Sequence, residues 1–321
     1  MKNIFKLSLL TLFCITILNS KTVFAETITV SFAGDCTLGT FTGQGMGNRF
    51  DEVYKEQTPD YFLKNVQAAF ANDDLTIVNL EGPLTDRKTV VQKKFPIRGE
   101  REYVNILTSG SVEMCALANN HMLDCGDKGL KETKETLAQN KIAYAYCDDI
   151  GYFTKNGITF ALLSFNGFSD TKNLRDQIQK DITEAKKKAD IVAVMYHWGI
   201  EREYKFNASQ QNLAHFTIDS GADLVIGGHP HVLQGVETYK GCSIAYSLGN
   251  FSFGANKNPK DKDAYIFQQT FEVKNKKIVN RKTNIIPCKI SSVDTKNNYQ
   301  PTIQTGTEAT RIMEKIQKYS K

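Results

Sequence analysis

Short apolar runs rich in β-forming residues alternate with helix-like stretches along most of the chain. The apolar runs cover residues 27–33, 75–80, 112–118, 158–164, 191–196 and 223–226. The helix-like stretches between them cover residues 59–71, 128–140, 176–189 and 208–220. Because strands that are apolar almost throughout must be covered on both faces, this alternation predicts an α/β fold with helices packed on the sheets.

The rhythm changes after Gly235, where strand follows strand. Predicted strands cover residues 236–239, 243–246, 265–273 and 277–286, and Lys274-Asn275-Lys276 is typical of a hairpin turn between the last two. Since no linker-like stretch interrupts residues 26–321, we expect one domain with a mixed second sheet. A C-terminal hairpin and a helix near residues 308–319 are expected to follow from about residue 255.

Residues 1–25 have the pattern of a secretory signal. Lys2 and Lys6 precede a mostly apolar run over residues 7–18, and Val23-Phe24-Ala25 ends on the small residue that a cleavage site needs. The run is shorter than the roughly 20 residues of a membrane span. We therefore expect a secreted or extracytoplasmic protein with a cleaved signal peptide. An uncleaved N-terminal membrane anchor is the alternative.

Charge and cysteine spacing exclude several classes of protein. The whole chain has 40 basic and 35 acidic residues, but residues 26–254 hold 23 basic and 29 acidic ones, which argues against nucleic-acid binding. The basic surplus lies after residue 254, either as a contact for an anionic polymer or as lysines on solvated faces. No Cys-x-x-Cys pair occurs, which excludes a zinc ribbon, and we expect the six cysteines after residue 25 to be mostly buried thiols.

Chemically reactive side chains follow five of the predicted strands. The motifs are Gly34-Asp35, Asn79-Leu80-Glu81-Gly82, Asn119-Asn120-His121, His197-Trp198-Gly199 and Gly227-Gly228-His229-Pro230-His231. The carboxyl ends of strands in α/β sheets form the ligand crevice, so residues far apart in sequence should converge there.

The residue types at these strand ends predict a metal site. Carboxylate oxygens, an amide oxygen and neutral imidazoles suit Zn, Mn or Fe, and the set is large enough for one or two divalent ions. Four of the chain's five histidines lie in these motifs, and the fifth, His215, is expected to be structural. Each motif residue alone also has a plain interpretation as a turn, cap or core residue.

The ordered motifs resemble the poly-γ-glutamate capsule-biosynthesis (CapA-type) proteins of the calcineurin-like metallophosphatase superfamily. The resemblance covers residues 27–253 and includes His197-Trp198-Gly199-Ile200-Glu201, Gly228-His229-Pro230-His231-Val232-Leu233-Gln234 and Tyr246-Ser247-Leu248-Gly249-Asn250-Phe251. It implies a four-layer α/β/β/α sandwich with two mixed sheets.

The resemblance also implies roles for single residues. One metal would be held by Asp35, Glu81 and His231. The second would be held by Glu81 as a bridge, Asn120, His197 and His229. His121 matches the position that donates a proton to the leaving group. Glu201, Gln234 and Asn250 are expected to support the ligands or to contact substrate.

Two departures from the superfamily pattern affect the first metal position. The usual Asp-x-His is Asp35-Cys36-Thr37 here, so one imidazole ligand is missing, and Glu81 replaces the shorter bridging Asp. CapA-type proteins share both changes. A thiolate ligand from Cys36 is one alternative for the missing group.

These observations leave three functions open. The first is a secreted metal-dependent hydrolase of a phosphoester or of the γ-glutamyl amide of an anionic polymer or envelope substrate. The second is a non-catalytic, polymer-binding subunit of a membrane capsule synthesis and export complex. A general phosphoesterase is the third, and the missing imidazole weighs against it.

Overall fold

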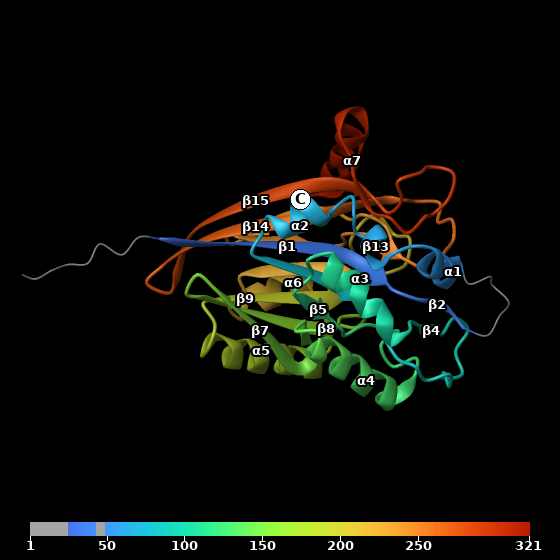
Figure 1. Ribbon diagram of the computed structural model, residues 1–321. Helices are drawn as coiled ribbons and strands as arrows, with labels where there is room; N and C mark the ends of the chain where they lie inside the picture. The colour runs from blue at the N-terminus through green and yellow to red at the C-terminus, as the bar shows by residue number, and fades with distance from the viewer. Residues whose placement is uncertain (1–24, 43–48) are drawn as a thin grey trace, which may run out of the picture.

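The computed structural model describes residues 25–42 and 49–321, so the predicted signal peptide lies almost entirely outside the described residues. Two large sheets pack face to face (Figure 1). The larger sheet has the order β16 (Thr302–Ile303), β15 (Lys277–Lys289), β14 (Asp263–Lys274), β1 (Glu26–Thr37), β3 (Leu75–Leu80), β5 (Met114–Ala116) and β6 (Ala143–Ala145), and β13 (Asn250–Phe253) also pairs with β1.

The second sheet has the order β11 (Val236–Tyr239), β12 (Cys242–Ala245), β10 (Leu224–Gly228), β9 (Ile191–His197), β8 (Ile158–Asn166) and β7 (Cys147–Lys155). A small ribbon joins β2 (Thr40–Phe41) to β4 (Ile97–Arg98). The α-helices are α1 (Arg49–Glu56), α2 (Gln67–Ala71), α3 (Val104–Ser109), α4 (Gly126–Gln139), α5 (Lys172–Lys186), α6 (Ala208–Asp219) and α7 (Gly306–Tyr319).

Three apolar layers hold this arrangement together. The middle layer joins the inner faces of the sheets, where Phe32 of β1 meets Phe160 of β8. A second layer lies between the larger sheet and α1 to α4, and a third between the smaller sheet and the helices α5 and α6. The predicted four-layer α/β/β/α sandwich is therefore confirmed.

Some local expectations changed in the structure. The stretch 59–71 is not one helix, because Val66 leaves the helical region at φ −124° and ψ −13° and α2 begins only after it. The C-terminal hairpin is present, and Asn275 and Lys276 turn it with positive φ angles of 50° and 61°. The helix α7 contacts β15 and β11, one strand from each sheet. No helix within residues 25–42 and 49–321 is long and apolar enough to cross a membrane.

The pairing of the strands places the reactive residues at one edge. β1, β3 and β5 run parallel, and so do β8, β9, β10 and β12, so their carboxyl ends lie together in each sheet. Asp35 stands opposite Asn79 on β3 and opposite Asn250 on β13. The two sheets then bring both sets of strand ends to the same end of the molecule.

Candidate metal centre

The structure brings together all six residues that the sequence predicted as metal ligands. Asp35, Glu81 and His231 each offer a ligand atom, and these atoms lie within 4.8 Å of one another. Within this group, His231 Nδ1 lies 3.3 Å from Asp35 Oδ2. This group corresponds to the predicted first metal position, and its role as a ligand set stays a prediction.

The predicted second position forms around His197. Its Nε2 atom lies 2.8 Å from Asn120 Oδ1, 3.1 Å from His229 Nδ1 and 3.5 Å from Glu81 Oε1. On the other side of the ring, Asn79 Nδ2 lies 3.1 Å from Nδ1 and 2.7 Å from Asp35 Oδ1. Asn79 therefore fixes the ring and leaves Nε2 directed at the other three groups.

One buried oxygen at the centre shows that the site suits a cation. Glu81 is 1% exposed, and its Oε2 atom accepts a hydrogen bond from Thr37 Oγ1 at 2.9 Å. Its Oε1 atom has no hydrogen-bond partner among the described residues, yet it lies 3.5 Å from His197 Nε2 and 3.9 Å from His231 Nε2. A buried carboxylate oxygen without a donor is costly unless a cation binds it, so this donor set fits divalent metal.

Backbone features hold the loops at these distances. A Cβ atom on Gly34 would lie 1.9 Å from the carbonyl oxygen of Gly249, so only glycine lets β1 approach that loop. His229 and His231 adopt positive φ angles of 93° and 57°. Asp35 Oδ2 accepts the backbone N–H of His229 at 3.0 Å, which ties the two sheets together at the site.

Burial and neighbouring charges set the protonation of the imidazoles. Burial lowers the pKa of His197 well below its usual value, and it lowers the pKa of His229 to about 4. Both rings are therefore neutral at pH 7, which is the protonation state that metal binding requires. Burial would also lower the pKa of His231, but the carboxylates of Glu81 and Asp35 raise it to about 10. A cation binding there must displace that proton.

The predicted proton donor His121 is held by a residue that sequence reasoning missed. Asp124 Oδ2 lies 2.6 Å from His121 Nδ1 and accepts the backbone N–H of Ile97 at 2.7 Å. Lys93 Nζ lies 3.0 Å from Asp124 Oδ1 and 3.2 Å from His121 Nδ1. With Nδ1 engaged, Nε2 is the nitrogen that can transfer a proton. The only sequence signal was an acid three residues after the histidine.

The three residues expected to support the site differ in what they do. Asn250 Oδ1 lies 2.8 Å from His231 Nδ1 and orients that ring. Gln234 has hydrogen-bond partners outside the predicted ligands, because its side chain donates to the carbonyl of Glu203 and accepts from the side chain of Gln210. Glu201 is the one of the three whose carboxylate belongs to a ligand-distance group, which it forms with His229 and His231.

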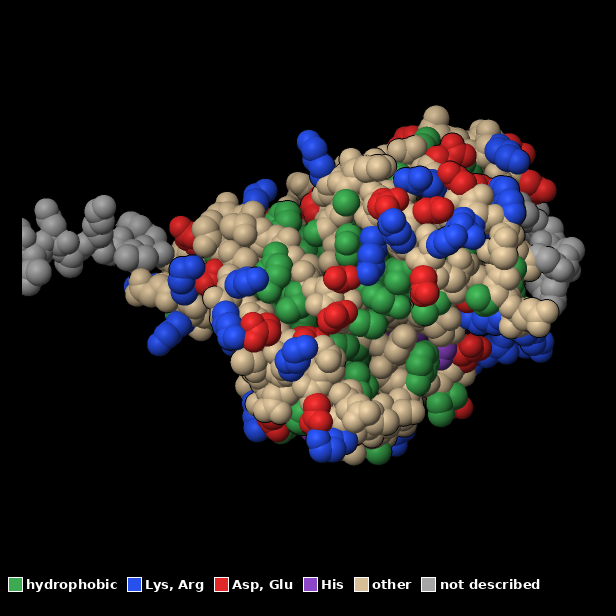
Figure 2. Space-filling model, turned by 90° about the horizontal axis from the view of Figure 1, so that it is seen from below, with side chains coloured by type: hydrophobic (Ala, Val, Ile, Leu, Met, Phe, Trp, Pro, Cys, Tyr) green, Lys and Arg blue, Asp and Glu red, His purple; other side chains and the backbone are tan. Residues whose placement is uncertain are grey.

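Phe168 is a second residue that sequence reasoning missed. The residue is 44% exposed, and its ring meets His229 edge-on, with 4.7 Å between ring centroids. The same ring lies 5.9 Å from that of His197. On the face shown in Figure 2, histidine surface appears only as a small patch among hydrophobic and charged side chains. His197 and His229 are buried, at 1% and 6% exposed, and the aromatic side chain of Phe168 borders both rings.

Cys36 and His215 lie outside the ligand groups. Burial raises the pKa of the Cys36 thiol to about 12, and the residue packs in the core beneath the larger sheet, so the thiolate alternative gains no support. His215 stacks on Tyr239 and bonds Glu237, as expected for a structural histidine. All six cysteines in the described part of the chain are free, and five of them are buried.

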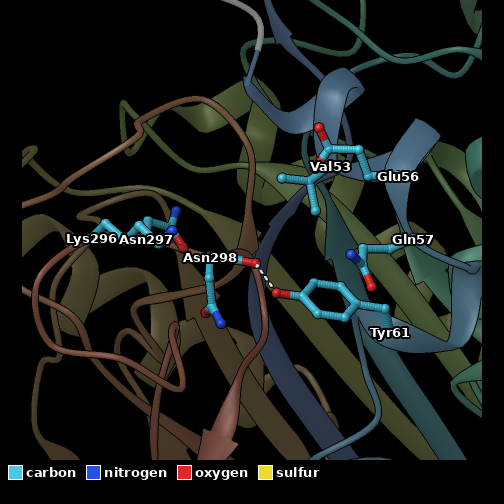
Figure 3. Close-up of a pocket in the computed structure, with 7 residues that line it drawn as sticks. All are labelled: Val53, Glu56, Gln57, Tyr61, Lys296, Asn297 and Asn298. Atoms are coloured by element: carbon cyan, nitrogen blue, oxygen red, sulfur yellow. Dashed lines mark hydrogen bonds between the residues drawn. The ribbon is translucent and has the colours of Figure 1, made fainter.

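A separate hollow of about 180 Å³ lies between α1 and the segment 296–298. Figure 3 shows Tyr61 at its edge, where the hydroxyl donates to the carbonyl of Asn298 at 3.2 Å. None of the predicted metal ligands lines this hollow. The candidate site is therefore the histidine–carboxylate cluster and not this depression.

The fold and the site together define the class of this protein, a two-sheet α/β/β/α sandwich with histidines and carboxylates at the carboxyl ends of its strands. Within that class, the chain belongs to the bacterial capsule synthesis protein PGA_cap family, whose model matches residues 29–255. That stretch contains every predicted site residue.

Similar proteins support this assignment. The chain is 34% identical to the PGA biosynthesis protein CapA of Bacillus subtilis (strain 168), over 73% of this chain and 65% of that protein. It is 32% identical to the capsule biosynthesis protein CapA of Bacillus anthracis, over 71% of this chain and 60% of that protein. The matches thus span less than two thirds of these relatives. A hypothetical protein from Thermus thermophilus shares the fold, with a TM-score of 0.50, 15% identity, and coverage of 81% of this chain and 99% of that one.

Proposed function

We propose that this protein acts in capsule biosynthesis as a secreted metal-dependent hydrolase of poly-γ-glutamate or of a related envelope substrate. The similar Bacillus proteins are named for PGA and capsule biosynthesis, which suggests the substrate class. The observation that supports a metal-dependent activity is the buried Glu81 Oε1 atom. It has no hydrogen-bond donor among the described residues and lies within 4 Å of two imidazole nitrogens.

The chain's own residues have distinct tasks in this proposal. Asp35, Glu81 and His231, with Asn120, His197 and His229, would hold one or two divalent ions such as Mn, Zn or Fe. A bound ion would polarise the scissile carbonyl or phosphoryl group and lower the pKa of a water molecule. His121, oriented through Nδ1 by Asp124, would give a proton to the leaving amine or alkoxide.

Elemental analysis of the purified protein tests the metal site. We expect bound metal in the wild type and in His215→Gln, a histidine variant outside the site. Glu81→Gln and His229→Ala should lose most of it, because each removes a central donor. No metal in the wild type after incubation with Mn²⁺ and Zn²⁺ would contradict the proposal.

Turnover tests the hydrolase step separately. His121→Ala should keep its metal but hydrolyse γ-glutamyl amides or phosphoesters about 10²–10⁴-fold more slowly, the usual loss for a general acid. If the metal-loaded wild type turns over neither substrate class, the catalytic role is wrong even though the metal site stands.

The missing imidazole at Asp35-Cys36-Thr37 favours a second candidate, a non-catalytic subunit that holds anionic polymer. Exposed Lys274, Lys276 and Lys277 form the basic tip of the β14–β15 hairpin. This tip lies beside Glu26 at the start of β1, nine residues or about 30 Å from Asp35 along the strand. Normal capsule formation by cells that carry only His121→Ala, together with loss of capsule in a variant that neutralises the three lysines, would favour this candidate.

A further inference from the structure

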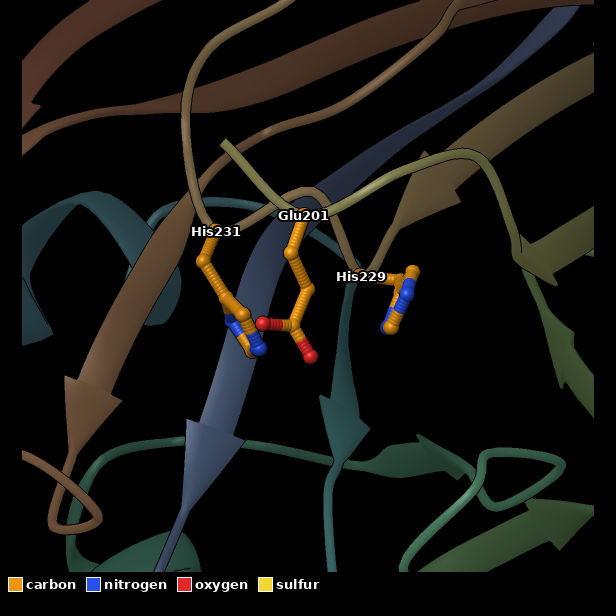
Figure 4. A group of neighbouring side chains, drawn as sticks. All are labelled: Glu201, His229 and His231. Atoms are coloured by element: carbon orange, nitrogen blue, oxygen red, sulfur yellow. The ribbon is translucent and has the colours of Figure 1, made fainter. Parts of the chain in front are cut away.

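Glu201 lies in the loop between β9 and α6, and its carboxylate reaches the candidate metal centre. The side chain is exposed, and its ligand oxygen lies within 4.8 Å of ligand atoms of both His229 and His231. Figure 4 shows the carboxylate beside the His231 ring, on the side that faces His229. The group shares His231 with the Asp35–Glu81 group, so the two sets adjoin.

The loop that carries Glu201 is fixed at both ends to the loop that carries the two histidines. Before it, the backbone N–H of Trp198 donates to the carbonyl of Gly228 at 3.1 Å. After it, the backbone N–H of Arg202 donates to the carbonyl of Pro230 at 2.8 Å. Glu201 therefore stands between two cross-loop hydrogen bonds, and its backbone position relative to His229 and His231 is set by the fold.

We propose that Glu201 is a metal ligand that stands in for the imidazole missing from Asp35-Cys36-Thr37, an inference that rests on the proposed metal site. Ligands at tetrahedral positions around an ion with bonds of about 2.1 Å lie about 3.4 Å apart. The three ligand atoms of Glu201, His229 and His231 lie within 4.8 Å of one another, so they need to close by no more than about 1.4 Å. An exposed glutamate with three rotatable bonds achieves this by rotamer changes.

The chemistry of the neighbouring residues supports this assignment. Cys36, which adjoins the place of the lost ligand in sequence, is buried in the apolar layer between the larger sheet and its helices and belongs to neither ligand-distance group. The orphaned Glu81 Oε1 atom independently points to a cation within reach of His231. Glu201 adds a third carboxylate, so three anionic ligands would face two divalent ions and leave a net positive site that attracts an anionic substrate.

Metal loading of Glu201→Gln in the whole chain tests this inference, with Glu203→Gln as the matched control. Both residues are exposed glutamates in the same loop, so neither substitution should disturb folding. Titration calorimetry and elemental analysis with Mn²⁺ and with Zn²⁺ would measure affinity and the number of ions per chain. We expect Glu203→Gln to load like the wild type and Glu201→Gln to bind one ion at least 10–100-fold more weakly.

The outcomes separate this inference from the proposed function. If Glu201→Gln binds both ions as tightly as the wild type, the ligand role of Glu201 is wrong, while the metal site itself stands. If the wild type binds no ion under any condition, the metal site fails and the ligand role fails with it. Equal weakening in both glutamate variants would also overturn the inference, because it would indicate a general charge effect.

Discussion

Replacing Asp124 with alanine would remove the anchor of the predicted proton donor. Asp124 is 2% exposed, and its carboxylate bonds the backbone N–H of Ile97 at 2.7 Å and His121 Nδ1 at 2.6 Å. Lys93 also pairs with it at 3.0 Å, but that side chain is 31% exposed. The substitution therefore leaves two buried donors without an acceptor, whereas the partly solvated Lys93 keeps a hydrogen bond to the carbonyl of Asn120 at 2.8 Å.

The expected loss of stability follows from these contacts. A hydrogen bond to a charged group contributes about 1.5–3 kcal/mol. We take the lower value, because alanine also removes the cost of burying the carboxylate. The loss of the two buried hydrogen bonds then lowers the free energy of unfolding by about 3 kcal/mol. The Lys93 pair adds less than about 1 kcal/mol because solvent screens it. In a domain of this size, about 3 kcal/mol lowers Tm by roughly 6 °C.

Urea denaturation followed by the fluorescence of Trp198, the chain's one tryptophan, measures this loss. Asp86→Ala, which removes an exposed acid from the β3–β4 loop that also carries Lys93, should change the free energy of unfolding by less than about 0.5 kcal/mol. Asp124→Asn keeps an acceptor for Ile97 and should lose about half as much as Asp124→Ala. A loss below about 1 kcal/mol in Asp124→Ala would refute the view that this carboxylate anchors His121.

Three further substitutions have defined outcomes. Burial raises the pKa of Asp73 to about 7, so the contribution of this side chain to stability is lost as pH rises from about 4 through 7. Over that range, urea denaturation should show the Asp73→Asn variant becoming more stable relative to the wild type. Burial would raise the pKa of Asp263, but hydrogen bonds from Arg311 and a neighbouring lysine lower it. Asp263→Asn should therefore lower the free energy of unfolding at pH 7 by about 1–3 kcal/mol, and the difference from the wild type should vanish in acid below pH 3.8. Trp198 Nε1 donates to the buried carbonyl of Tyr246 at 2.8 Å, so Trp198→Phe should lower the free energy of unfolding by at least about 1–3 kcal/mol. Thermal unfolding followed by circular dichroism measures this loss, and an unchanged melting curve would count against a stabilising role for that hydrogen bond.

Much of the fold and of the site could be predicted because both leave local patterns. Apolar strands such as β9 are buried at every position, and that continuity is visible in the sequence. The ligand candidates follow such strands directly, and parallel strands align their carboxyl ends. The predicted site residues therefore gather at one edge, as the chain order of the motifs indicated.

The residues that escaped prediction depend on how loops from different strands meet. Asp124 is held in place by a hydrogen bond from the backbone of Ile97, and Phe168 lies against the ring of His229. No periodic pattern in the sequence predicts these contacts. Likewise, Gln234 carries a family motif position but turns toward the loop of Glu203.

The sequence by itself determined the alternation of strands and helices, and it determined which residue types stand at the strand ends, because periodicity and burial are local properties of a chain. Only the tertiary structure decided how those residues pair. The hydrogen bond from the His229 backbone to Asp35 spans 194 positions, and the Glu201 loop is fixed by the carbonyl of Pro230. Such contacts arise from the packing of two sheets and of the loops between them, so they exist only once the chain has folded.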